Sequence, residues 1–248
     1  MLLTGLLGAT QSVSAQSKVV VSHDEWYTGP GTMGSNEQQF VLNSLTWMNV
    51  LGGSALVYSS NGFLTNSTFL NYLAAQGMTT TVSTSPAPFN NYGVVFVEGN
   101  PSYDAVGLGA YVLGGGNVVY IGGTGTGGAP AEAAYSNLFL NQFGLSFQPS
   151  YNGIGTVNTV GYDTQGPFGA PLFTGVSSVY GNNGNSITAS APPAGWTNQV
   201  FLDAQGNGVF AAAAVTATPE PATLGLFATG VIAMAGAVRR RKQRNAVA

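Results

Sequence analysis

Four titratable side chains are the residues of this chain best suited to chemistry. His23, Asp24 and Glu25 directly follow an apolar run, and Glu98 ends another. Both runs are rich in valine and predict strands. Parallel strands place their carboxyl ends at one edge of a sheet, where open α/β sheets bind ligands, so the four side chains are expected to share a crevice. Together they could bind a hard cation or exchange protons.

A structural interpretation of the same residues is the alternative. His23 and Asp24 could hydrogen-bond the loop backbone while Glu25 remains solvated, and this interpretation is the preferred one. No metal site, cofactor or catalytic residue is therefore predicted. Aromatic residues that could stack on a sugar are Trp26, Tyr27, Trp47, Tyr58, Tyr92, Tyr103 and Tyr151, of which Trp47 is expected in the core.

The glycine-rich loop 122–130 is the second candidate site. It contains a G-x-G-x-x-G pattern, whose backbone amides can bind an anion, and Thr124 and Thr126 add hydroxyl groups. The loop follows the fifth predicted strand rather than the first. Gln148 also stands where a dinucleotide site needs an acid for the ribose. A flexible loop is therefore preferred, with a small anion or sugar as the alternative ligand.

Charge is scarce and unevenly distributed. Only 6% of the 248 residues are charged, against roughly 25% in a typical soluble domain. Residues 17–218 carry one base, Lys18, against eight acids, a net charge of −7 with His23 neutral. Such a body cannot neutralise a run of phosphates, which excludes nucleic acid as a partner. The chain has no cysteine, which excludes disulfides and thiol catalysis.

Strand and helix signals alternate from residue 18 to residue 148. The predicted strands cover 19–22, 55–59, 79–83, 94–98, 118–121 and 145–148. The predicted helices cover 35–50, 66–77, 103–116 and 131–144. This alternation predicts an α/β fold with a mostly parallel sheet and helices on both faces. Residues 199–204 and 209–215 predict a C-terminal hairpin added to the sheet edge.

The second half of this body carries a family resemblance. A helix ending in tyrosine-valine and paired glycines (111–116) leads to a strand that ends in Gly-Gly (118–123). This pattern is similar to the class I glutamine amidotransferase-like superfamily and implies a flavodoxin-like domain over 18–215. Catalytic members carry Gly-x-Cys-x-Gly after that strand, whereas Gly125 stands here in place of the cysteine. Amidotransferase chemistry is therefore not expected.

The N-terminal segment 1–15 predicts a signal peptide. An apolar stretch is followed by small residues, and Val13-Ser14-Ala15 fits the preference of signal peptidase for small side chains before the cut. The segment therefore predicts export of the body.

The C-terminal segment has three ordered parts. The linker 216–222 contains a Pro-Glu-Pro motif, formed by Pro219, Glu220 and Pro221. Residues 223–238 are uncharged and mostly apolar, and as a helix of about 24 Å they predict a transmembrane span. The tail 239–248 is predicted to be cytoplasmic because of its basic residues, Arg239, Arg240, Arg241, Lys242 and Arg244.

These three parts together resemble the PEP-CTERM sorting domain. The resemblance implies recognition by an exosortase, a membrane cysteine transpeptidase, and processing near the Pro-Glu-Pro motif. It also implies an inner-membrane intermediate held by the C-terminal helix, followed by release to the cell envelope or the extracellular space. A plain single-span anchor is the alternative.

Two functions follow from the sequence. The first is an exported, exosortase-sorted protein with a non-catalytic α/β binding or structural domain, in an exopolysaccharide or biofilm context. Extracellular polysaccharide is its candidate partner. The second is an extracytoplasmic hydrolase that uses a crevice of His23, Asp24, Glu25 and Glu98.

Overall fold

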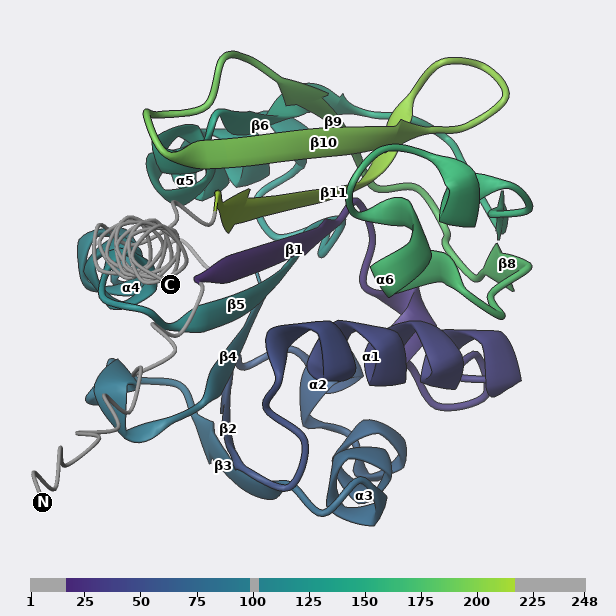
Figure 1. The fold of residues 1–248 in the computed structure, drawn as a ribbon. Helices are drawn as coiled ribbons and strands as arrows, with labels where there is room; N and C mark the ends of the chain where they lie inside the picture. The colour runs from purple at the N-terminus through teal and green to yellow at the C-terminus, as the bar shows by residue number, and fades with distance from the viewer. Residues whose placement is uncertain (1–16, 99–102, 217–248) are drawn as a thin grey trace, which may run out of the picture. The chain divides into compact units, whose positions relative to one another are not determined.

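A seven-stranded sheet organises the body in the computed structural model, which describes residues 17–98 and 103–216 (Figure 1). Its strands are, in spatial order, β10 (Trp196–Leu202), β11 (Gly208–Val215), β1 (Lys18–Ser22), β5 (Asn117–Ile121), β4 (Val94–Glu98), β2 (Ser54–Tyr58) and β3 (Thr79–Ser83). The five strands from β1 to β3 are parallel. The prediction of a mixed α/β fold with a mostly parallel sheet is confirmed.

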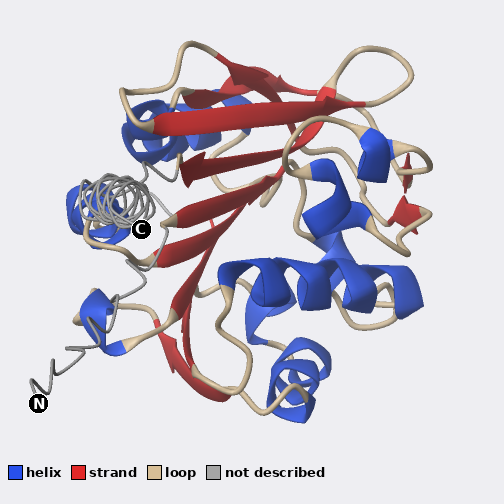
Figure 2. Ribbon diagram, viewed as in Figure 1, coloured by secondary structure: helices blue, strands red, loops and turns tan. Residues whose placement is uncertain are grey.

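Helices cover both faces of this sheet (Figure 2). They are α1 (Ser35–Met48), α2 (Gly62–Thr65), α3 (Ser67–Ala75), α4 (Ala105–Leu113), α5 (Ala129–Leu140) and α6 (Gly169–Phe173). Apolar side chains of α1, α3 and α6 join one core cluster, and those of α4 and α5 join the other. Each helix therefore buries its apolar side against one face of the sheet.

Successive side chains of a strand belong alternately to the two core clusters. In β1, Val20 belongs to the cluster of α1, whereas Val19 and Val21 belong to the cluster of α4. All three are fully buried. Successive side chains of a strand point to opposite faces, so a strand covered on both sides must be apolar throughout. This requirement explains the continuous valine runs in the sequence.

The predicted C-terminal hairpin is observed as β10 and β11, with β11 antiparallel to β1. The predicted flavodoxin-like order is wrong in one respect. A flavodoxin-like sheet has the order 2-1-3-4-5, but here the parallel strands run β3-β2-β4-β5-β1. The positions in the sheet are the same, but the N-terminal strand β1 occupies the position that the last strand has in a flavodoxin-like sheet. Local sequence patterns do not encode this order because it depends on long-range pairing.

Strand β6 (Leu145–Tyr151) is a second correction. The alternation predicted it as a member of the central sheet, but it pairs antiparallel with β9 (Asn185–Ala189) in a separate two-stranded sheet. The edge of β1 that it could have extended is occupied by β11. A further short pair joins β7 (Val157–Asn158) to β8 (Ser178–Val179).

The chain divides into two units, Met1–Val215 and Thr216–Ala248, and the fold described above belongs to the first. The predicted signal peptide, linker motif, transmembrane span and basic tail lie outside the described residues. Within 17–98 and 103–216, no helix has the length and apolar character needed to cross a membrane.

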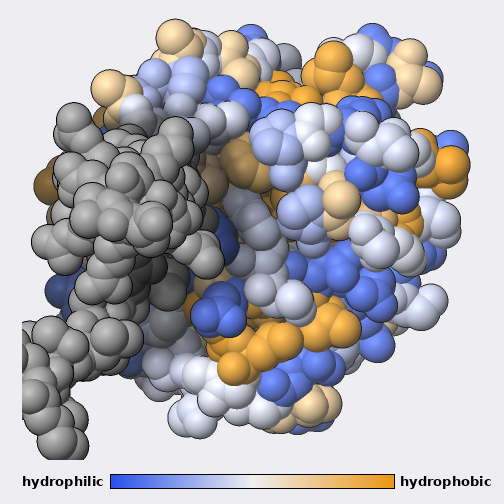
Figure 3. Space-filling model, in the orientation of Figure 1, coloured by the Kyte–Doolittle hydropathy of each residue, from blue (hydrophilic) through white to orange (hydrophobic). Residues whose placement is uncertain are grey.

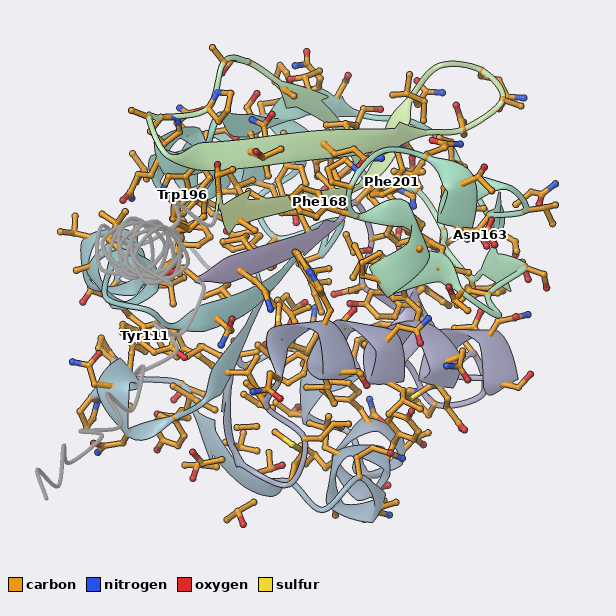
Figure 4. All side chains as sticks on the ribbon, in the orientation of Figure 1. Tyr111, Asp163, Phe168, Trp196 and Phe201 are labelled. Carbon is orange, nitrogen blue, oxygen red and sulfur yellow. The ribbon has the colours of Figure 1, made fainter. Side chains whose placement is uncertain are left out.

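Most charged side chains of the described body are buried. His23, Asp24, Glu25, Glu37, Glu98 and Glu132 are each at most 7% exposed. Lys18, Asp104 and Asp203 are half-buried, which leaves Asp163 as the one exposed charge in the described ranges (Figure 4). Hydrophilic and hydrophobic atoms are interspersed on the face shown in Figure 3. The polar surface must therefore consist mainly of uncharged side chains.

Candidate functional site

Three buried glutamates lie at the carboxyl edge of the parallel strands. Glu25 follows β1 and precedes a one-turn helix, η1 (Trp26–Thr28), while Glu98 ends β4. Glu132 lies in the first turn of α5, the helix that follows β5. Each glutamate is at most 5% exposed. The charges of Glu98 and Glu132 both act on Glu25, so the three carboxyl groups form one electrostatic cluster.

Glu25 and Glu98 form a carboxyl pair. Burial, the hydrogen bond with Glu98 and the charge of Glu98 raise the pKa of Glu25 to about 10. Burial also raises the pKa of Glu98, although Ser59 favours its charged form by donating from Oγ to Oε2 at 2.5 Å. Asn61 donates from Nδ2 to Oε2 of Glu25. With a pKa of about 10, Glu25 is protonated at neutral pH and can donate a hydrogen bond.

A protonated Glu25 accounts for an otherwise orphaned atom. Oε1 of Glu98 is buried and has no hydrogen-bond partner among the described residues. A buried acceptor without a donor costs roughly 1–3 kcal/mol. A protonated Glu25 can supply the missing donor, because the two carboxyl groups are within hydrogen-bonding reach.

Glu132 organises the glycine-rich loop. Its Oε1 accepts a hydrogen bond from the backbone N–H of Thr124 at 2.7 Å, and its Oε2 accepts from the hydroxyl of Tyr151 at 3.2 Å. Burial is the main cause that raises the pKa of Glu132. The carboxyl group of Glu132 thus binds the backbone amide of Thr124, which the glycine-rich pattern had indicated as a possible binding group for an external anion.

The two threonines of this loop have different environments. Thr124 is half-buried, and its Oγ1 accepts from the backbone N–H of Thr126 at 3.2 Å. Thr126 is exposed, and its carbonyl accepts from the hydroxyl of Tyr135 at 3.2 Å. The side chain of Thr124 also hydrogen-bonds Glu132, so this part of the loop is ordered around that carboxyl group.

Asp24 fixes the turn into the site. Its Oδ1 accepts from the backbone N–H of Trp26 at 2.7 Å. Burial raises the pKa of Asp24 to about 6, and backbone hydrogen bonds from Trp26, Asn182 and Asn183 partly oppose that increase. Asp24 therefore joins the loop after β1 to the loop before β9, as the structural interpretation expects.

His23 is held by a different set of contacts. Its Nδ1 lies 3.2 Å from Nδ2 of Asn152, and its ring meets Phe210 edge-on with the centroids 6.1 Å apart. Burial lowers the pKa of His23 to about 3, against a raising effect from the charge of Asp203. The imidazole is therefore neutral at physiological pH. These contacts place its described partners on β11 and the loop after β6, not on the carboxyl pair.

Glu25 is buried, so the solvated position that the structural interpretation gave it is not observed. Trp26 is half-buried beside it, with its ring 4.8 Å from that of Phe63 and 6.2 Å from that of Tyr180. Tyr180 is 37% exposed. The site therefore combines carboxyl groups with an aromatic cluster that reaches the surface.

The remaining sugar-stacking candidates fall into two groups. Tyr27, Tyr58 and Tyr103 are buried and belong to the core. Trp47 is half-buried against the ring of Phe168, 5.2 Å away, in agreement with its expected packing role (Figure 4 labels Phe168). Tyr92 and Tyr151 are half-buried.

Sequence reasoning missed Ser59, Asn61 and Glu132, and it gave Tyr151 as a stacking residue rather than as a hydrogen-bond donor to Glu132. Ser59 and Asn61 directly follow β2, so the rule that placed Glu98 at the carboxyl edge could have found them. Glu132 follows the glycine loop on a predicted helix, and nothing local indicates that it folds back onto that loop. In the described part of the chain, no three His, Asp or Glu side chains are arranged to hold a metal ion.

A comparison with protein-family models decides the character of the C-terminal segment. Residues 217–242 match the PEP-CTERM protein-sorting motif. The chain carries a PEP-CTERM motif. This motif points to an exported protein that an exosortase sorts and processes at the membrane, so the predicted exosortase partnership is supported.

Searches of curated proteins and of solved structures returned no match. The resemblance of the body to the class I glutamine amidotransferase-like superfamily is therefore not confirmed by a relative, and it stays a prediction.

Proposed function

We propose that this exosortase-sorted protein presents a non-catalytic α/β domain that binds extracellular polysaccharide in the cell envelope or the extracellular matrix. The observation that carries the proposal is the Glu25–Glu98 pair at the ligand-binding edge of the sheet. A protonated Glu25 offers a hydrogen-bond donor, and the carboxyl oxygens of the pair offer acceptors. Hydroxyl groups of an uncharged sugar need both.

The aromatic cluster and the surface support the same ligand class. Trp26 directly follows Glu25 in the chain and, with Phe63 and Tyr180 beside it, adds apolar area. Binding sites commonly combine such apolar area with a few placed polar groups. A surface with one exposed charge in the described ranges also gives little attraction to a highly charged ligand.

Hydrolysis is the second candidate, because paired carboxyls that share a proton can act as acid and base. The contacts of His23 with Asn152 and Phe210 give it no described role beside that pair. We therefore favour binding over catalysis.

One assay separates these two functions. We expect the purified chain to be retained on immobilised neutral exopolysaccharide and to leave the polymer length unchanged. Glu98→Gln should reduce retention about tenfold, as expected for loss of a hydrogen bond to a charged group. Asp163→Asn, at the exposed acid, is the matched control and should bind normally. Shortening of the polymer would support the hydrolase, and equal retention of both variants would contradict the proposed site.

Sorting has its own test in cells. Replacing Pro219, Glu220 and Pro221 together with alanine should leave an unprocessed chain in the membrane fraction, because the motif at residues 217–242 would no longer be recognised. Intact-mass measurement and fractionation provide the readout. Replacing Pro86 and Pro88, which have the same spacing as Pro219 and Pro221, is the control and should not alter processing. Normal processing of the triple variant would contradict an exosortase-dependent route.

A further inference from the structure

The last strand of the sheet, β3, has one open edge. In the described ranges no strand lies beyond it (Figure 1). The backbone N–H of Thr79 donates to Gly53 at 2.9 Å, and the carbonyl of Ser83 accepts from Ser59 at 3.1 Å. Backbone groups alternate in direction along a strand, so those of Thr80 and Val82 point away from β2.

Strand β3 itself carries none of the features that usually protect an edge against pairing. Natural edge strands are commonly guarded by a lysine, a proline, a bulge or a covering segment. Strand β3 reads TTTVS, and its register with β2 is unbroken over all five residues. Thr79 and Thr81 are exposed, and Val82 is 45% exposed. Threonine and valine also have high β-propensity. The strand is therefore suited to accept another strand.

The charge pattern identifies the partner. Residues 38–97 contain no Asp, Glu, Lys, Arg or His, and this stretch includes β2, α2, α3 and β3. A charged partner would find no complementary charge here. Two copies of this edge, in contrast, can approach without the like-charge repulsion that normally keeps identical surfaces apart. The neutral edge is therefore complementary to itself.

We propose that β3 pairs antiparallel with β3 of a second copy of this chain, about a two-fold axis through Thr81. Thr80 of each copy then lies opposite Val82 of the other, and each such pair exchanges both backbone hydrogen bonds. The two sheets become one continuous sheet. A two-fold contact of this kind uses the β3 edge of each copy, so at this edge it closes into a dimer. This inference goes beyond the proposed function and does not depend on the ligand.

The absence of cysteine makes the contact testable by cross-linking. Thr81 would face its own copy as a non-hydrogen-bonded pair with Cα atoms about 4.5 Å apart, which lies within disulfide range. We expect the purified full chain carrying Thr81→Cys to form an intermolecular disulfide under mild oxidation. Because no other cysteine is present, the dimer band on a non-reducing gel reports this contact alone.

The control is Val160→Cys, at a position that is 71% exposed and far along the chain from β3. Thr81→Cys should cross-link at least about tenfold faster than this control, because pairing holds the two thiols together. Association through the C-terminal segment would not favour one variant over the other. Equal rates for the two variants overturn the proposal.

A second variant tests the pairing itself. Val82→Lys places two like charges beside the axis and should abolish the fast cross-linking of Thr81→Cys in the double variant. Val160→Lys in the same background is the control and should leave it unchanged. Fast cross-linking that survives Val82→Lys also overturns the proposal. Circular dichroism of each variant confirms that the fold is retained.

Discussion

The free energy of unfolding should fall as the pH rises from 7 to 9. The folded pKa of Glu25 is about 10, well above the ordinary carboxyl value of 4.5, so the folded chain retains a proton that the unfolded chain releases. Stability from a raised carboxyl pKa is complete below the unfolded pKa and is lost towards the folded one. One proton changes the free energy by about 1.4 kcal/mol per pH unit, which gives about 2.7 kcal/mol over this interval.

Two other buried groups with shifted pKa values do not titrate in the folded chain between pH 7 and pH 9. Asp24, with a pKa of about 6, is already ionised there, and His23, with a pKa of about 3, is already neutral. Below pH 6.5 His23 acts in the opposite direction, because the unfolded chain then binds a proton that the folded chain does not. Stability should therefore be greatest in mildly acidic solution.

Urea unfolding at pH 7, 8 and 9 measures this dependence. Glu25→Gln keeps an oxygen for Asn61 and removes the titration, so the pH slope should decrease by about one proton. Asp163→Asn removes an exposed acid and should leave the slope unchanged. A wild-type slope in Glu25→Gln would show that the proton is not held at the pair.

Gly184→Ala should destabilise the fold by at least about 3 kcal/mol, the upper end for overpacking in a core. An added Cβ would lie 1.8 Å from the carbonyl oxygen of His23 and 2.7 Å from its Nδ1. The obstacle is backbone, which cannot move aside as a flexible side chain could. Moreover, the next residue, Asn185, donates from its N–H to the same carbonyl at 3.1 Å. The start of β9 must therefore separate from the loop after β1.

Gly62→Ala is the matched control. It lies at the start of α2, and an added Cβ there meets no atom within 4 Å. Alanine favours a helix over glycine, so this variant should be neutral or more stable by up to about 1 kcal/mol. Denaturation midpoints of the two variants give the comparison. A Gly184→Ala midpoint close to that of Gly62→Ala would mean that the contact between the loop and β9 is not required.

The sequence predicted the elements of this fold better than their pairing. Continuous valine runs mark β1 and β4 because strands buried on both faces must be apolar. No local pattern shows that β1 pairs with β11 or that β6 leaves the central sheet, because these pairings depend on competition between distant segments. A strand that ends in Gly-Gly and an alternation of strands and helices are compatible with several related α/β folds.

The candidate site was predictable to the same extent. The carboxyl-edge rule grouped Glu25 with Glu98 from segments far apart in the chain, and the two carboxyl groups interact in the structure. It also grouped His23 with them, although the side chain of this residue contacts Phe210 and Asn152. Side-chain direction within a loop depends on tertiary packing. For the same reason, the sequence did not show that the side chain of Glu132 turns towards the glycine-rich loop.

The position of β1 between β5 and β11 has a consequence for the order of folding. This strand is made first, but one of its two neighbours, β11, ends at Val215, almost at the matched sorting segment that begins at residue 217. Strand β1 therefore cannot complete its hydrogen bonds until nearly the whole body has been synthesised. Pairing across such a long separation is slow, because the intervening chain must first be ordered. Completion of the fold is therefore tied to the arrival of the segment that directs sorting.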